Sequence, residues 1–158
     1  MPTLPPLPHA TLGRLMGLLE AMERTPKSDS LSELAQALHL ELDDLLPLAQ
    51  ATQLLGFAVV REGRYDLTEG GRRAALGDER ERKALFRQGA QQAPLLRLIV
   101  EALAEAGREP VPREKILKRL GRRFPKAEAQ RQLDTAVNWG RYSDLFDYDA
   151  ETACFTGV

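Results

Sequence analysis

One order of helices and turns occurs twice along the chain, and this repetition limits the folds open to it. In the first half, apolar residues recur at helical spacing from Leu12 to Met22, and further helical segments follow at 30–40 and 42–56. Two short β-rich stretches, "FAVV" and "YDL", then flank the Gly-containing turn "REGR". Three helices followed by a hairpin form the order of a winged-helix unit.

Residues with capping preferences mark the ends of these helices. Ser30 with Glu33 three residues later is a capping box, which predicts a helix start. Either Asp43 or Asp44 is expected to cap the third helix, and Gly56 is placed to end it.

The second half repeats the order. A helix is predicted from Pro94, a favoured first residue, to Gly107. "VPREKILKRLG" and "PKAEAQRQLDTAVNWG" follow as helices, and "LFDYD" and "ACFTG" close a hairpin. We therefore expect a mostly α fold with small β wings, built from tandem winged-helix units. The expected parts are a flexible Pro-rich arm at 1–10, unit 1 at 11–76, a charged connector helix at 77–92 and unit 2 at 93–158.

The only Trp of the chain lies at the predicted end of the third helix of unit 2. The ring of Trp139 is expected to close the core against the wing, and Gly140 to supply the left-handed residue that turns the chain. Asp134 and Arg141 lie two helical turns apart. We expect an ion pair between them that fixes the helix end to the wing.

The charge of the chain is uneven, although its net value is −1. Residues 1–78 carry 7 basic and 11 acidic side chains, whereas residues 79–158 carry 15 and 12. We call the basic residues named at the end of this paragraph the basic face. A surface of this charge can meet an acidic partner or neutralise phosphates. A solvated surface is the alternative, since charge runs are usually solvated. The candidate interaction residues are Arg113, Lys115, Lys118, Arg119, Arg122, Arg123 and Lys126.

The charges of the third helices argue against DNA as the main partner. The third helix of unit 1 has acidic residues and no Lys or Arg, so it would approach phosphates with the wrong sign. The third helix of unit 2 is mixed, and nucleic acid stays open but unfavoured as a partner. Its residues able to contact bases or phosphates are Lys126, Gln130, Arg131, Gln132 and Asn138, beside Glu128 and Asp134.

Motifs for catalysis or metal binding are missing from the sequence. Cys154 is the single cysteine, and neither His9 nor His39 has a Cys or His partner at metal-ligand spacing. The hairpin acids at 144–151 lack the spacing of a calcium loop and are expected to face water. No signal peptide or membrane-spanning run is present. We expect a cytoplasmic protein that is not an enzyme and uses no cofactor or metal.

Several stretches of the chain resemble a known family. "LELDDLLPL", "LLGFA", "YDLTEGGRR", "ERKALFR" and "RQLDTAVNWGRYSDLFDYDAET" are similar to the AAA-associated C-terminal domain, over about Leu12 to Thr156. That domain follows the ATPase of ABC transporters of the nitrate/sulfonate/bicarbonate group. The resemblance implies a regulatory or docking role and transfers no catalytic residue. Because no GxxxxGK[ST] loop is present, we expect a free-standing homologue or a separately encoded partner of an ATPase.

The leading hypothesis is a non-enzymatic regulatory module that binds a protein, with an ABC transporter ATPase as the candidate partner. The opposite charges of the basic face and of the acidic third helix of unit 1 also allow a homo-oligomer that dissociates with salt. The alternative is a winged-helix DNA-binding transcriptional regulator that uses unit 2. Small-molecule sensing is a third hypothesis, for which the sequence offers no motif.

Overall fold

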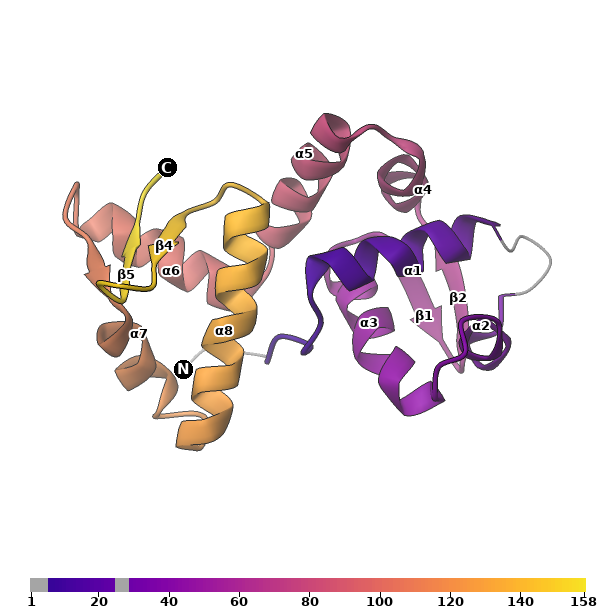
Figure 1. The fold of residues 1–158 in the computed structure, drawn as a ribbon, viewed down its shortest axis with the longest axis horizontal. Helices are drawn as coiled ribbons and strands as arrows, with labels where there is room; N and C mark the ends of the chain where they lie inside the picture. The colour runs from indigo at the N-terminus through magenta and orange to yellow at the C-terminus, as the bar shows by residue number, and fades with distance from the viewer. Residues whose placement is uncertain (1–5, 25–28) are drawn as a thin grey trace. The chain divides into compact units, whose positions relative to one another are not determined.

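The computed structural model describes residues 6–24 and 29–158 (Figure 1). The described chain divides into two compact units. The N-terminal unit is Pro8–Gly89, and the C-terminal unit is Ala90–Val158 together with the described residues Pro6 and Leu7. The described residues fold into helices and two small antiparallel sheets. This confirms the expected mostly α fold with small β wings.

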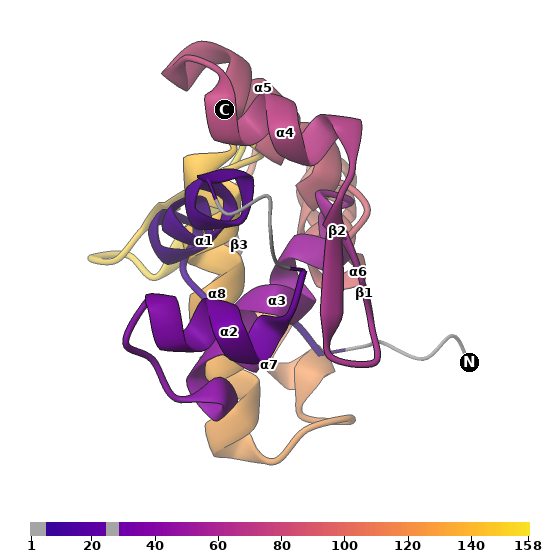
Figure 2. The same ribbon diagram turned by 90° about the vertical axis from the view of Figure 1, so that its right-hand side faces the viewer.

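Three helices and a hairpin form the winged-helix part of the N-terminal unit, and two further helices follow. Leu15, Leu19 and Leu45 are fully buried and belong to its core. The two strands lie side by side in Figure 2, and Ser30 forms an additional bridge with Arg64. The elements are α1 (Leu12–Arg24), α2 (Leu31–Ala37), α3 (Leu42–Leu54), β1 (Ala58–Arg61), β2 (Arg64–Leu67), α4 (Glu69–Leu76) and α5 (Glu79–Ala90).

The helix ends of this unit agree with the predictions except at one place. Ser30 caps α2, since its Oγ accepts from the Glu33 N–H at 3.3 Å. Gly56 ends α3 with a φ of 81°. The prediction that Asp43 or Asp44 caps α3 is wrong: the cap position is the residue before Leu42, and no side-chain cap bond forms. The two carboxylates lie in the first turn, where the helix dipole favours negative charge.

Helix α5 packs within the N-terminal unit. The Phe86 ring is fully buried and meets Phe57 edge to face, with ring centroids 5.0 Å apart. The Arg82 guanidinium donates to the Ala74 carbonyl at 2.8 Å and lies 3.3 Å from the Glu20 carboxylate. The segment expected to be a connector at 77–92 is therefore part of this unit up to Gly89. The segment is so rich in charged residues that the few apolar residues that anchor it, such as Phe86, could not be recognised from the sequence.

The C-terminal unit has the winged-helix order with a third strand. The sheet order is β3-β5-β4, so Phe155 on the central strand pairs with Val111 on one side and Tyr148 on the other. Ile99, Ile116, Leu133 and Trp139 are fully buried. The elements are α6 (Pro94–Glu105), β3 (Val111–Pro112), α7 (Arg113–Leu120), α8 (Lys126–Tyr142), β4 (Asp147–Asp149) and β5 (Cys154–Thr156).

Helix α8 ends at a later residue than the sequence predicts. Gly140 is a buried helical residue, and α8 continues to Tyr142. The left-handed residue is Asp144, with a φ of 55°. Asn and Asp are the non-glycine residues that adopt this conformation most readily. The prediction that Gly140 makes the turn is therefore wrong; the Phe146 ring occupies the space where a Cβ of residue 140 would lie.

The structure describes residues 6–10 of the arm expected at 1–10, and two of their side chains are buried. Residues 1–5 lie outside the described residues. Leu7 is 2% exposed and Ala10 is 6% exposed, so both are buried. Apolar packing therefore contributes to the position of the end of this segment, and its expected flexibility stays a prediction.

Candidate interaction site

The basic segment of the sequence folds into α7 and the turn that leads into α8. Ile116 and Leu120 lie four residues apart on α7 and are both fully buried. The opposite face of the helix therefore carries its exposed side chains, among them Lys115 and Lys118. The turn brings the start of α8, with the exposed Lys126, to the same side of the unit.

An open groove of about 880 Å³ lies between this face of α7 and the first turn of α8, and we call it the lysine groove. Its apolar surface comes from both helices and from the turn between them. Three ammonium groups and one carboxylate line it, so its net charge is positive. The lining residues are Pro112, Glu114, Lys115, Leu117, Lys118, Gly121, Phe124, Pro125, Lys126, Ala129 and Gln130.

The start of α8 adds to the positive potential of the lysine groove. Helix α8 begins at Lys126 after Pro125, without a hydrogen bond from a capping side chain. The first turn of a helix carries the positive end of the helix dipole. The groove thus combines apolar contact area with a field that attracts carboxylates.

The structure divides the predicted basic face into three groups. Lys115, Lys118 and Lys126 line the lysine groove. Arg119 and Arg122 are exposed but do not line it. The other two members of the predicted set are Arg113, which is mostly buried, and Arg123, which is exposed and has contacts of its own.

Arg113 has a structural role in the C-terminal unit. Its guanidinium donates to the Asp134 carboxylate at 2.8 Å and lies 5.9 Å from the centre of the Tyr148 ring. Its backbone N–H donates to the Ala153 carbonyl at 2.8 Å. With only 19% of its side chain exposed, Arg113 joins α7, α8 and the wing and is not available to a partner.

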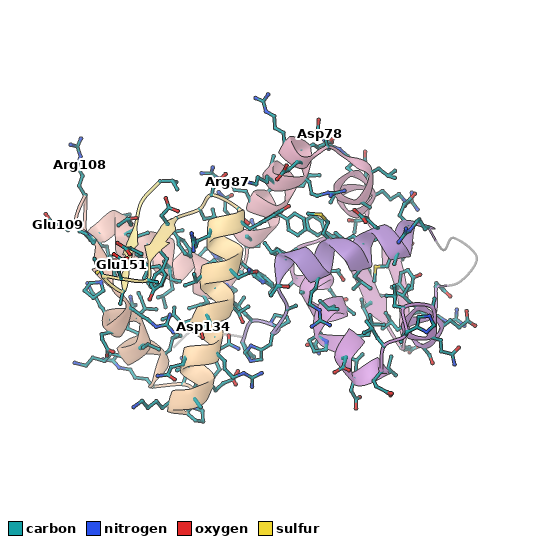
Figure 3. The ribbon with its side chains drawn as sticks, in the orientation of Figure 1. Asp78, Arg87, Arg108, Glu109, Asp134 and Glu151 are labelled. Atoms are coloured by element: carbon teal, nitrogen blue, oxygen red, sulfur yellow. The ribbon has the colours of Figure 1, made fainter. Side chains whose placement is uncertain are left out.

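The predicted ion pair between Asp134 and Arg141 is wrong. The partner of Asp134, which projects from α8 in Figure 3, is Arg113. A separation of seven residues is about 10 Å along a helix axis, farther than the three- or four-residue spacing at which side chains pair. Asp134 and Arg141 do line one smaller hollow of about 550 Å³, together with Val137, Asn138, Tyr142 and Asp147.

One residue proposed to read DNA bases is not available on the surface. Gln132 is 1% exposed, and its amide is bonded inside the unit. Arg131 is exposed but lies 3.6 Å from the Glu128 carboxylate. Helix α8 therefore has fewer side chains available to contact DNA than its sequence suggests.

The hairpin acids of the C-terminal unit are exposed at Asp144, Asp147 and Asp149, and Glu151 lies in the β4–β5 turn (Figure 3). No group of His, Cys, Asp and Glu within 6–24 and 29–158 is arranged to hold a metal ion. In the same described part of the chain, no helix combines the length and the apolar character needed to cross a membrane.

Comparison with known families supports the resemblance seen in the sequence. Residues 32–149 match the family described as the C-terminal AAA-associated domain. The chain belongs to this family. The matched part of the AAA-associated domain runs from α2 to β4 and includes every residue of the lysine groove. No curated protein and no solved structure matches the chain significantly.

Sequence reasoning found the lysines of the groove but missed its apolar surface. Leu117 and Phe124 are half-buried and lie between basic residues in the sequence. An apolar residue that interrupts a basic run was the available signal. It could not be interpreted without the turn that brings α7 and the start of α8 together.

Proposed function

We propose that this AAA-associated domain is a non-catalytic regulatory module, and that its lysine groove docks a segment of an ATPase. The observation that carries the proposal is the combination of three lysines with an apolar surface in one groove. Leu117 and Phe124 offer apolar contact area for a partner side chain, while the ammonium groups favour carboxylates. The segment that fits is acidic and contains apolar residues.

The family supports an ATPase as the partner, because its description is that of a domain associated with AAA proteins. The resemblance to the domain of anion-transport ABC proteins makes an ABC transporter ATPase the proposed example. Docking in the lysine groove would place this module against the ATPase that it is proposed to regulate.

A second copy of the chain is a competing partner for the lysine groove. The start of α3 exposes Leu42 by 42% and Leu46 by 38%, beside the exposed carboxylates of Asp43 and Asp44. The start of α3 therefore has the acidic and apolar residues that are proposed for a partner of the lysine groove. Self-association through these surfaces would weaken with salt, because exposed charges are screened.

The test compares three tagged proteins in native lysate, with and without nuclease treatment. The groove variant combines Lys115→Glu, Lys118→Glu and Lys126→Glu. The control variant, with the same change in net charge, combines Arg119→Glu and Arg122→Glu with Arg108→Glu, at exposed positions outside the groove. Captured ATPases are quantified by mass spectrometry.

We expect the wild type and the control variant to retain an ATPase that the groove variant loses. Equal retention by all three proteins would contradict the groove as the docking site. Recovery of DNA fragments before nuclease treatment, with loss of all protein partners after it, would instead support the DNA-binding alternative.

A further inference from the structure

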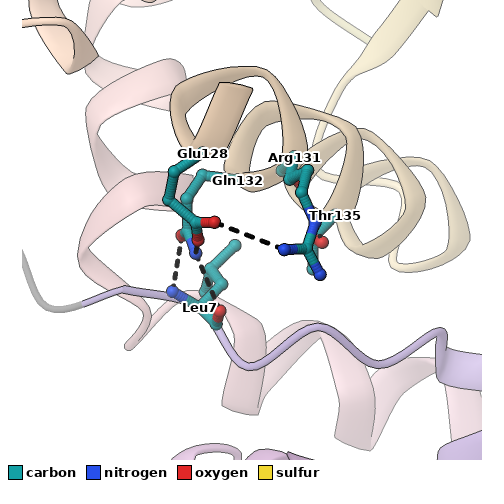
Figure 4. A network of polar contacts seen from close by, with 5 residues as sticks. All are labelled: Leu7, Glu128, Arg131, Gln132 and Thr135. Atoms are coloured by element: carbon teal, nitrogen blue, oxygen red, sulfur yellow. Dashed lines mark hydrogen bonds and ion pairs between the residues drawn. The ribbon is translucent and has the colours of Figure 1, made fainter. Parts of the chain in front are cut away.

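A single side chain of α8 holds both backbone polar groups of Leu7. The Leu7 N–H donates to Gln132 Oε1 at 2.6 Å, and Gln132 Nε2 donates to the Leu7 carbonyl at 3.0 Å (Figure 4). Leu7 is 2% exposed and Gln132 is 1% exposed, so these bonds are shielded from water. The amide thus replaces the neighbouring strand that would pair with Leu7 in a sheet.

Neighbouring residues on α8 fix the orientation of this amide. Gln132 Nε2 also donates to a Glu128 carboxylate oxygen at 3.1 Å, so both of its hydrogens have acceptors. The other oxygen of Glu128 lies 3.6 Å from the Arg131 guanidinium. The acceptor and the donor that meet Leu7 are therefore held in place, and we call Gln132, Glu128 and Arg131 the arm site.

The segment bound at the arm site has an unusual backbone chemistry. Leu7 lies between Pro6 and Pro8 in "PPLP", residues 5–8, where leucine supplies the only backbone N–H. A glutamine amide offers one acceptor and one donor to such a segment, which matches the single N–H and the carbonyl of the leucine. Proline also restricts the free segment to extended conformations, which lowers the entropy lost on binding.

We propose that the arm site is a receptor for a proline-flanked leucine, and that the Pro6–Pro8 segment of a second copy binds there in exchange for the chain's own. Every copy carries both the segment and its receptor. Leu7 belongs to the C-terminal unit, yet the chain continues from it at Pro8 into the N-terminal unit. Exchange of an identical segment keeps each contact and gives a dimer at low cost.

Complementary full-length variants test the exchange. Leu7→Asp keeps the receptor but puts a charged side chain in the place of the buried leucine, whereas Gln132→Glu keeps the segment but places an oxygen opposite the Leu7 carbonyl. Each variant alone is expected to be monomeric by light scattering. An equimolar mixture is expected to form a one-to-one dimer whose amount rises with protein concentration. A mixture that stays monomeric at all concentrations would overturn the exchange.

A peptide assay on the Leu7→Asp chain does not depend on the folding of the Gln132 variant. The probe is a labelled peptide with the sequence of residues 3–10, TLPPLPHA, and its control carries Asp in place of Leu7. We expect the probe to bind at least about tenfold more tightly than the control, since the control lacks the buried leucine side chain and would have to bury a charged carboxylate in its place. Equal binding of the two peptides would overturn the receptor.

Salt separates this interaction from charge-driven docking in the lysine groove. The contacts of Leu7 are hydrogen bonds to an uncharged amide and apolar packing, so the dimer of complementary variants is expected to persist at 0.5 M salt, well above about 0.15 M physiological ionic strength. A dimer that dissociates over this range would contradict exchange at the arm site and would favour the acidic start of α3 as the self-association surface.

Discussion

The ring of Phe146 lies against Gly140, so closely that no methyl group fits between them. Both residues are buried, and both belong to the block that contains the only Trp. The contact joins the last turns of α8 to the start of the wing. Glycine is needed at this position for close packing, with an ordinary helical backbone.

We predict that Gly140→Ala destabilises the C-terminal unit by about 1 to 3 kcal/mol, because an added methyl group in a packed core forces the Phe146 ring to move. Thermal unfolding followed by the fluorescence of the buried Trp139 measures the effect. The matched control is Gly17→Ala in α1, where a Cβ meets no atom within 4 Å; because α1 belongs to the N-terminal unit, its unfolding is followed by circular dichroism. The control is expected to stabilise its own helix by about 0.5 to 1 kcal/mol, given the better helix propensity of alanine. An unchanged unfolding temperature for Gly140→Ala would contradict the packing.

A double-mutant cycle distinguishes the two candidate partners of Asp134. We predict a coupling of about 0.2 to 1 kcal/mol between Arg113→Ala and Asp134→Ala, the range of ion pairs with an exposed partner. Arg113→Ala alone is expected to cost more than Asp134→Ala, since it also removes the packing over Tyr148. The same cycle with Arg141→Ala should give no coupling. A larger coupling for Arg141 in chemical denaturation would restore the pairing expected from the sequence.

Helix α5 provides a test of where the N-terminal unit ends. Phe86→Ala is expected to destabilise that unit by about 3 to 5 kcal/mol, the cost of removing a buried aromatic ring. Leu76→Ala is the control, because Leu76 is 71% exposed and its truncation should change stability by less than about 0.5 kcal/mol. Urea unfolding followed by circular dichroism measures both. If α5 were only a connector, the two variants would unfold alike.

The lysine groove is expected to contribute to binding without contributing to stability. Each single change, Lys115→Glu, Lys118→Glu or Lys126→Glu, should alter the free energy of unfolding by less than about 0.5 kcal/mol, because these side chains are exposed. Binding of an acidic partner should weaken with each change and with added salt. Unfolding of the groove variants at much lower urea would show that the lysines are structural.

The order of elements could be predicted from sequence because it depends on local signals. Ser30 with Glu33 marked the start of α2, and Gly56 marked the end of α3, through interactions within a few residues. The turn at Glu62 and Gly63 has positive φ at both residues, as a two-residue hairpin turn of type I′ requires.

Contacts between distant residues could not be predicted in this way. The role of Gly140 depends on where the Phe146 ring packs, and the burial of Gln132 depends on a residue 125 positions away. Arg113 belongs to a basic run in the sequence, but its side chain pairs with Asp134 and is mostly buried. It is therefore not part of the interaction surface. Of the predicted basic face, sequence identified the lysines of the groove but not the apolar residues between them.

Crosslinking from within the lysine groove tests the proposed docking most directly. A photoreactive amino acid replaces Leu117, which lines the groove, or Arg122, which is exposed outside it, in the otherwise unchanged chain. After irradiation in the native cells, crosslinked peptides are sequenced. Docking in the groove predicts that position 117 links to an acidic segment of an ATPase, and that position 122 does so far less. Links from position 117 to nucleic acid, or equal links to the ATPase from both positions, would contradict it.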